Sequence, residues 1–110
     1  MVLGGLVTLF VRDANVAVRF YIETLGMKLV ASREGAEVID AGDGFLLELR
    51  GLGGVMPPML KNVPLVTFYA KVPLAEALAI YENRGVVFDA EGRFADPDGN
   101  ALRLAARSVV

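Results

Sequence analysis

The stretch FADPDGNALRL, residues 94–104, contains two short segments of strand character on either side of a turn. In the turn Asp96–Asn100, proline comes early, glycine stands where the backbone needs a positive φ, and the side chains can cap the loop. Ala101–Ala105 alternates leucine with alanine and arginine, which is typical of a strand with one apolar side. With Gly92–Ala95 before the turn, the stretch predicts two strands joined by a tight connection.

Together with the residues before it, this stretch predicts a complete β-α-β-β-β module. Leu65–Val72 is expected as its first strand and Val86–Asp89 as its second. Between them, Pro73 suits the first turn of a helix because its missing N–H does no harm there, and Gly85 ends that helix. The expected apolar stripe of the helix consists of Leu74, Ala77, Leu78 and Tyr81.

The first half of the chain predicts the same order of elements. The segment Leu3–Val11 is apolar on both faces, and we therefore expect a strand in the centre of a sheet rather than at its edge. Asp13 is placed as the N-cap of a helix that Gly26 ends. Three strands are expected to follow, with turns at Gly35 and Asp43-Gly44: Met27–Glu34, Ala36–Ala41 and Phe45–Leu52.

The two halves are therefore interpreted as two copies of one module in an α+β domain of residues 1–110. Module one covers about residues 1–52, a linker covers 53–64, and module two covers about 65–110. The linker is too apolar for an ordinary solvated loop, which indicates either a loop on a neighbouring hydrophobic surface or a lid or subunit contact. A shift of 60 residues places Ala17, Phe20 and Tyr21 on Ala77, Ile80 and Tyr81.

The composition excludes several classes of function. The chain has 110 residues, 55% of them hydrophobic, which is typical of a compact globular domain. It has no cysteine, which excludes a disulfide framework and a thiolate metal site, and no histidine, the commonest metal ligand and general base. A net charge of −2 argues against a nucleic-acid partner. No apolar run is long enough for a membrane span, so we expect a cytoplasmic protein without a membrane partner.

The alternation along the expected strands separates a purely apolar side, which must pack under the helices, from a side of mixed character. Polar groups among large apolar ones are typical of the wall of a ligand cleft. The alternative is that the charged members face water on a sheet that is covered on one side. The candidate ligand-binding residues are Leu6, Thr8, Phe10, Glu48, Arg50, Thr67, Tyr69 and Arg103.

Two motifs resemble the signatures of the vicinal oxygen chelate superfamily, which contains glyoxalase I, bleomycin-resistance proteins and extradiol dioxygenases. They are Asp13-x-x-x-Ala17-x-x-Phe20-Tyr21-x-x-x-Leu25-Gly26 and Phe94-x-Asp96-Pro97-Asp98-Gly99-Asn100. The resemblance covers nearly the whole chain. It implies two β-α-β-β-β modules that form an incomplete barrel around a cleft, commonly completed by dimerisation, and we therefore expect a homodimer.

The resemblance also implies four metal-ligand positions, two in each module. These positions fall on Leu6, Glu48, Thr67 (or Val66 if the register shifts by one) and Arg103. Leu6 has no donor atom, and the permanent positive charge of Arg103 would repel a divalent ion. We therefore predict no metal and no other cofactor, and neither glyoxalase I nor dioxygenase chemistry by the metal mechanism of the family.

The leading hypothesis is a metal-free small-molecule-binding protein with no catalytic residue. In it, Glu48 and Arg103 form an ion pair that offers the guanidinium to a carboxylate or phosphate of the ligand; otherwise the two are surface charges that never meet. One alternative is a cofactor-independent lyase or isomerase with Glu48 as base, which a nearby Arg103 would oppose by lowering its pKa. Another is a non-catalytic dimeric module whose cleft is filled by its own side chains.

Overall fold

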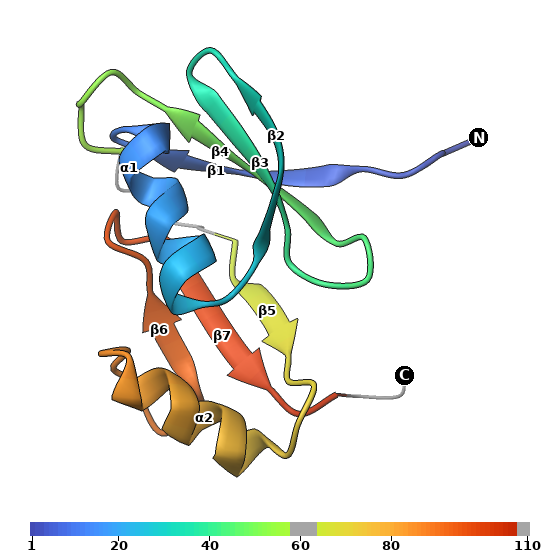
Figure 1. The fold of residues 1–110 in the computed structure, drawn as a ribbon, viewed down its shortest axis with the longest axis vertical. Coiled ribbons are helices and arrows are strands. Elements are labelled where there is room, and N and C mark those ends of the chain that lie inside the picture. Colours follow the sequence, from blue (N-terminus) through green and yellow to red (C-terminus); the bar gives the residue numbers. More distant parts are fainter. Residues whose placement is uncertain (58–63, 108–110) are drawn as a thin grey trace. The chain divides into compact units, whose positions relative to one another are not determined.

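The computed structural model describes residues 1–57 and 64–107, so part of the predicted linker, residues 58–63, lies outside the described residues. The chain divides between residues 59 and 60 into two compact units. Each unit combines one sheet with a helix on one of its faces, as Figure 1 shows for α1 in unit 1 and α2 in unit 2. The prediction of an α+β chain with two related modules is confirmed.

Unit 1 contains a four-stranded mixed sheet. Its elements are β1 (Leu6–Val11), α1 (Ala14–Arg19), a π-helical turn η1 (Phe20–Thr24), β2 (Lys28–Arg33), β3 (Ala36–Asp40) and β4 (Leu46–Gly51). The strand order is β1-β4-β3-β2, in which β1 runs parallel to β4 and the other pairs are antiparallel. The order of elements is therefore the predicted β-α-β-β-β.

The helix of unit 1 begins and ends where the sequence predicts. The Asp13 carboxylate accepts hydrogen bonds from the backbone N–H of Asn15 at 2.9 Å and of Val16 at 3.3 Å, which satisfies two donors that a helix start leaves unpaired. Gly26 adopts a φ of 76° just after η1. Tyr21, at the junction of α1 and η1, is completely buried.

The helix-facing side of the sheet forms the core of unit 1. Its side chains are 0–4% exposed, and each such burial stabilises the fold by about 1.5–3 kcal/mol. The prediction that the purely apolar side of each strand packs under a helix is confirmed here. The residues are Leu9, Val11, Ile39, Leu47 and Leu49.

The expectation of a central first strand is wrong. β1 lies at the end of the four-stranded sheet and begins at Leu6, while Leu3 is fully exposed. On the face away from α1, Leu6 and Phe10 remain 45% and 44% exposed. Apolar residues on both faces indicate which side chains can be covered, but they do not require a hydrogen-bonded strand on each side.

Unit 2 contains a three-stranded sheet. Its elements are β5 (Val66–Tyr69), α2 (Leu74–Asn83), β6 (Arg93–Ala95) and β7 (Ala101–Ala105). The order is β5-β7-β6, with β5 parallel to β7 and β6 antiparallel to β7. Pro73 immediately precedes the helix and Gly85, at a φ of 92°, follows it, close to the predicted bounds.

The predicted strand Val86–Asp89 does not form. Val86 is buried and the Phe88 ring packs edge-on against Phe94 at 5.1 Å between centroids, so this segment supplies core contacts from an irregular backbone. The chain then turns, because the Asp89 carboxylate accepts from the backbone N–H of Glu91 and Arg93 at 2.8 and 2.9 Å. Within the described residues, unit 2 therefore has three strands where unit 1 has four.

The turn Asp96–Asn100 has the predicted construction. Asp96 is 5% exposed, and its Oδ1 accepts from the backbone N–H of Asp98 at 2.9 Å and of Asn100 at 2.8 Å. Gly99 adopts a φ of 87°, which favours glycine. Among the described residues no helix is long and apolar enough for a membrane span.

Candidate functional site

The face of the unit 1 sheet away from α1 carries the five candidate residues of module one. Because β1 and β4 are parallel neighbours, Thr8 lies beside Glu48 and Phe10 lies beside Arg50. Leu6 lies one step further along the same face, beside Leu46. The predicted grouping of these side chains on one face is therefore confirmed within unit 1.

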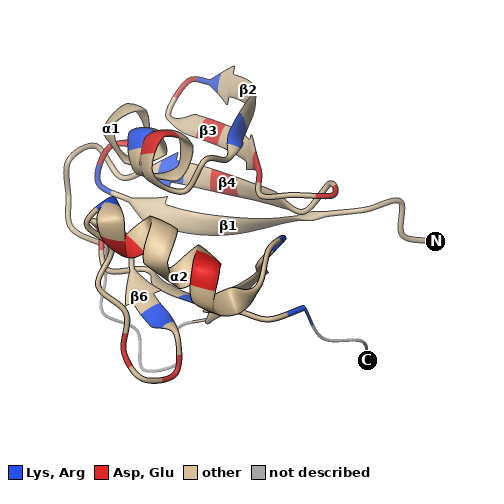
Figure 2. Cartoon of the chain, turned by 60° about the horizontal axis from the view of Figure 1, so that its bottom comes forward, with Lys and Arg blue, Asp and Glu red and all other residues tan. Residues whose placement is uncertain are grey.

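Glu48 is the chemical centre of this face. It is the acidic residue of β4, drawn red in Figure 2, and its side chain is 9% exposed. The Thr8 hydroxyl donates to Oε1 at 3.0 Å. Arg50 donates from Nε to Oε1 at 3.2 Å and from Nη2 to Oε2 at 3.1 Å. Both carboxylate oxygens are thus engaged by residues of unit 1.

These contacts lower the pKa of Glu48 below its usual value. The hydrogen bond from Arg50 is the largest cause, followed by the hydrogen bond from Thr8, and both outweigh the opposing effect of burial. The positive charges of Arg50 and Arg33 act in the same direction. The carboxylate is therefore ionised at neutral pH and is a weak base.

Arg33 is a contributor that the sequence interpretation did not include. A bulge between Leu29 and Ala31 shifts the register of β2 against β3 by one residue. As a result, Arg33 pairs with Ala36, whose other neighbour is Arg50, and so shares a face with Glu48. Strict alternation would place Arg33 on the opposite face, so the sequence held no simple signal for it.

The corresponding face of unit 2 carries the remaining three candidates. Thr67 lies beside Arg103 and Tyr69 lies beside Ala105 on the parallel strands β5 and β7. Val66 is 5% exposed on the helix-facing side. The sequence allowed either Thr67 or Val66 at the third ligand position. In the structure, Thr67 lies on the open face, by which we mean the face of the sheet away from the helix.

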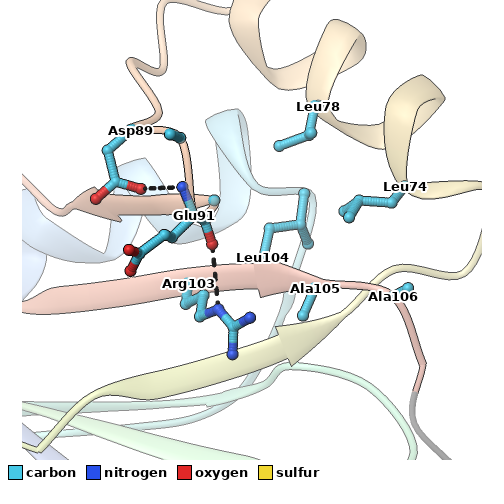
Figure 3. Close-up of a pocket in the computed structure, with 10 residues that line it drawn as sticks. Leu74, Leu78, Asp89, Glu91, Arg103, Leu104, Ala105 and Ala106 are labelled. Carbon is cyan, nitrogen blue, oxygen red and sulfur yellow. Dashed lines mark hydrogen bonds between the residues drawn. The ribbon is translucent and has the colours of Figure 1, made fainter.

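Arg103 is held by the backbone of the turn before β6. Its Nε donates to the carbonyl oxygen of Glu91 at 3.2 Å, and Figure 3 shows the guanidinium on the side of β7 away from Leu104. The neighbouring Arg93 is paired with the Glu91 carboxylate, Nη2 to Oε2, at 3.2 Å. The sequence did not predict Glu91 as the partner of Arg103, because the acceptor is a backbone carbonyl, which every residue type has.

On the other side of β7, unit 2 has a hollow of about 450 Å³ between α2 and the end of the strand. Its walls are mixed: Leu74 and Leu78 from the helix face Leu104, and the lining also includes Asp89, Glu91 and Arg103 (Figure 3). Asp89 at its rim has a lowered pKa, because the backbone N–H groups of Arg93 and Glu91 bond its carboxylate. That carboxylate therefore has a structural role in the turn.

The donor set does not fit the divalent metal of the resembled family. Of the four implied ligand positions, Leu6 offers no donor, Thr67 a neutral hydroxyl and Arg103 a cation. The remaining ligand, Glu48, already accepts hydrogen bonds from Thr8 and Arg50. The described residues contain no group of three or more His, Cys, Asp or Glu that could hold a metal ion.

Glu48 and Arg103 each have a partner within their own unit. Arg50, two residues along the same strand, is the cation that pairs with Glu48, and the Glu91 carbonyl is the acceptor for Arg103. The ion pair between Glu48 and Arg103 stays a prediction.

Comparison with known proteins places this geometry in context. No family model and no curated protein matches the chain. Among solved structures, an antibiotic-binding protein from Streptomyces sp. CB03234 is 26% identical, with a TM-score of 0.68 over 98% of this chain and 99% of that one. A glyoxalase/dioxygenase from Nostoc punctiforme is 16% identical, with a TM-score of 0.76 over 94% of this chain and 89% of that one.

A third solved structure is named after three groups of proteins that the two sequence motifs resemble. A glyoxalase/bleomycin resistance protein/dioxygenase from Alicyclobacillus acidocaldarius is 22% identical, with a TM-score of 0.67 over 91% of this chain and 87% of that one. The fold, the two motifs and these likenesses agree. The chain therefore has the vicinal oxygen chelate fold.

Proposed function

We propose that this protein is a metal-free small-molecule-binding protein of the glyoxalase/bleomycin-resistance type. In this proposal the ligand occupies the barrel cleft that the superfamily resemblance implies. The candidate ligand-binding residues are Leu6, Thr8, Phe10, Glu48 and Arg50 in unit 1 and Thr67, Tyr69 and Arg103 in unit 2. The aromatic and aliphatic groups supply most of the affinity, and the polar groups orient the ligand.

The observation that carries the proposal is the engagement of Glu48. Its carboxylate is 9% exposed, bonded by Thr8 and Arg50, and held at a lowered pKa. A single carboxylate is too few ligands for a metal ion, and its lowered pKa makes it a weaker general base than an unperturbed glutamate. This argues for binding over the alternative of a lyase or isomerase with Glu48 as its base. The antibiotic-binding protein of similar fold supports the same class of function.

A thermal-shift screen over antibiotics and metabolites tests the proposal directly. A true ligand at 100 times its dissociation constant stabilises the native state by about 2.7 kcal/mol. Binders that lose affinity when Tyr69 is replaced by alanine support the proposal. A screen with no binder favours the alternative of a cleft filled by its own side chains.

Metal content of the purified protein is the second test. We expect elemental analysis to find less than one equivalent of zinc, nickel, iron or manganese, and chelation to leave the melting temperature unchanged. Stoichiometric metal that is lost on replacing Glu48 with glutamine would contradict the proposal. The proposed homodimer is tested separately by light scattering.

A further inference from the structure

The open faces of the two units repeat one pattern of side chains. Along β1, the residues facing away from the helix are Leu6, Thr8 and Phe10; at the start of unit 2 they are Leu65, Thr67 and Tyr69. Each sequence is therefore leucine, threonine and an aromatic residue in alternate positions. In each unit the threonine lies beside a charged residue of the parallel neighbouring strand, and the sign of that charge is opposite in the two units.

In unit 1 this arrangement holds a carboxylate. Glu48 receives a hydrogen bond from the Thr8 hydroxyl at 3.0 Å and two from the Arg50 guanidinium at 3.2 and 3.1 Å. A hydroxyl donor together with the fork of an arginine is a strong combination for a carboxylate, because both its oxygens are bonded and its charge is compensated.

In unit 2 a threonine hydroxyl and an arginine guanidinium again lie close together. The strand position that Glu48 occupies in unit 1 is here occupied by the arginine, so the residue beside the threonine on that strand is not acidic. Thr67 and Arg103 are neighbours across β5 and β7. Arg103 uses Nε to bond the Glu91 carbonyl, as the dashed line in Figure 3 shows, which fixes the plane of the guanidinium. Within the described part of unit 2, no residue accepts a hydrogen bond from its Nη1 or Nη2 or from the Thr67 hydroxyl.

Several strand neighbours of Arg103 on this face have small side chains. The residues two positions before and after it on β7 are Ala101 and Ala105, and Ala95 lies beside Ala101 on β6. Tyr69, beside Ala105, is 55% exposed and offers an aromatic surface. The nearest second cation, Arg93, is already paired with Glu91. Within the described part of unit 2, the terminal nitrogens of Arg103 therefore have no hydrogen-bond acceptor, although its charge acts on the nearby Asp89 carboxylate.

We infer that unit 2 binds the carboxylate of a small aromatic acid, with the carboxylate on the Arg103 guanidinium and the Thr67 hydroxyl and the ring against Tyr69. The ligand's carboxylate then has the kind of partners that Glu48 has in unit 1. This inference rests on the proposed function and specifies its ligand class: an aromatic organic anion.

Benzoate and its neutral analogue benzamide are the probes that test this inference. Their affinities for the full chain are measured by two-dimensional amide NMR titration, which detects weak binding and identifies the residues that respond. We expect benzoate to bind at least about tenfold more tightly than benzamide, which is the scale of a hydrogen bond to a charged group. The amide signals of Thr67 and Arg103 should shift with benzoate.

Three variants locate the binding. Arg103→Gln should abolish the preference for benzoate, and Thr67→Val should weaken benzoate binding by about threefold to tenfold. Arg93→Gln is the matched control, since it removes a neighbouring cation on the same face that is already paired, and we expect it to change the affinity less than twofold. The amide spectrum of each variant shows whether it is folded.

The outcomes separate this inference from the proposed function. If benzoate and benzamide bind equally, if inorganic phosphate binds more tightly than benzoate, or if Arg93→Gln has the effect expected of Arg103→Gln, the inference is wrong. Neutral ligands found in the thermal-shift screen would then still support a binding protein. A screen without any binder would count against both.

Discussion

Thr8 and Glu48 are neighbours on two parallel strands, and the Thr8 hydroxyl donates to Glu48 Oε1 at 3.0 Å. Glu48 is nearly buried, so each hydrogen bond it loses leaves an incompletely satisfied charge. This hydrogen bond links the stability of unit 1 to the ionisation of Glu48. In unit 2 the corresponding threonine lies beside an arginine instead of a glutamate.

Replacing Thr8 with valine removes this hydrogen bond with little change in shape. We expect the free energy of unfolding to fall by about 1.5–3 kcal/mol, the contribution of a hydrogen bond to a charged group. Thr67→Val is the matched control, because the structure records no hydrogen bond of the Thr67 hydroxyl within the described part of unit 2. Urea denaturation measures both values, and equal losses in the two variants would contradict the assigned role of Thr8.

The pH dependence of stability follows from the lowered pKa of Glu48. Because its folded-state pKa lies below the usual 4.5, the carboxylate stabilises the native state fully at pH values above 4.5. That contribution is lost as the pH falls through the lower, folded-state pKa. We therefore expect the free energy of unfolding to decrease below about pH 4.5, and the decrease to be shallower in Glu48→Gln.

Asp89 titrates in the same direction and must be separated from Glu48. Its pKa is also lowered, chiefly by the backbone N–H groups of Arg93 and Glu91. The double variant Glu48→Gln, Asp89→Asn should therefore show a still shallower decrease than Glu48→Gln alone. A profile unchanged by Glu48→Gln would mean that other carboxylates determine the acid stability.

Gly92 is required by both its conformation and its surroundings. Its φ is 79°, and a Cβ added there would lie 2.5 Å from the backbone oxygen of Leu104, whose N–H donates to the Gly92 carbonyl at 2.9 Å. We expect Gly92→Ala to cost more than about 2 kcal/mol. Gly85→Ala is the control: its φ is 92°, but the added Cβ meets nothing within 4 Å, so backbone strain of about 1–2 kcal/mol is its whole cost.

The sequence predicted what depends on local chemistry. The cap at Asp13, the turn at Asp96–Asn100 and the separation of Thr8 and Glu48 from the apolar side each follow from residue type and spacing, and the structure has all of them. The edge position of β1 and the irregular backbone of Val86–Asp89 depend on pairing between distant segments, for which alternation carries no signal.

The candidate site shows the same division. The open faces were predictable because the period of a strand is two, whereas Arg33 reaches the face of Glu48 only through the bulge at Leu29 and Ala31. The sequence predicted Arg103 of the other module as a partner of Glu48, and it did not predict the pairing of Glu48 with its strand neighbour Arg50. Residues two apart on a strand share a face, so long side chains there can pair directly.

The buried carboxylate of Asp96 provides a last test, because burial should decide what its hydrogen bonds contribute. Asp96 is 5% exposed and accepts from the backbone N–H of Asp98 and Asn100 and, through Oδ2, from Asn100 Nδ2 at 2.9 Å. Asp96→Ala leaves these donors without the carboxylate and should cost about 2–3 kcal/mol. Asp96→Asn restores one acceptor but can place its amide nitrogen against Asn100 Nδ2, so it should recover part of the loss.

Asp89 is the control for this prediction, since its carboxylate also accepts two backbone N–H groups but is exposed to solvent. Water can satisfy the donors that Asp89→Ala leaves, whereas the interior around Asp96 cannot. We therefore expect a smaller loss for Asp89→Ala than for Asp96→Ala in urea denaturation. Equal losses would show that the two backbone hydrogen bonds that both carboxylates accept, and not the burial of the carboxylate, determine how much each turn stabilises unit 2.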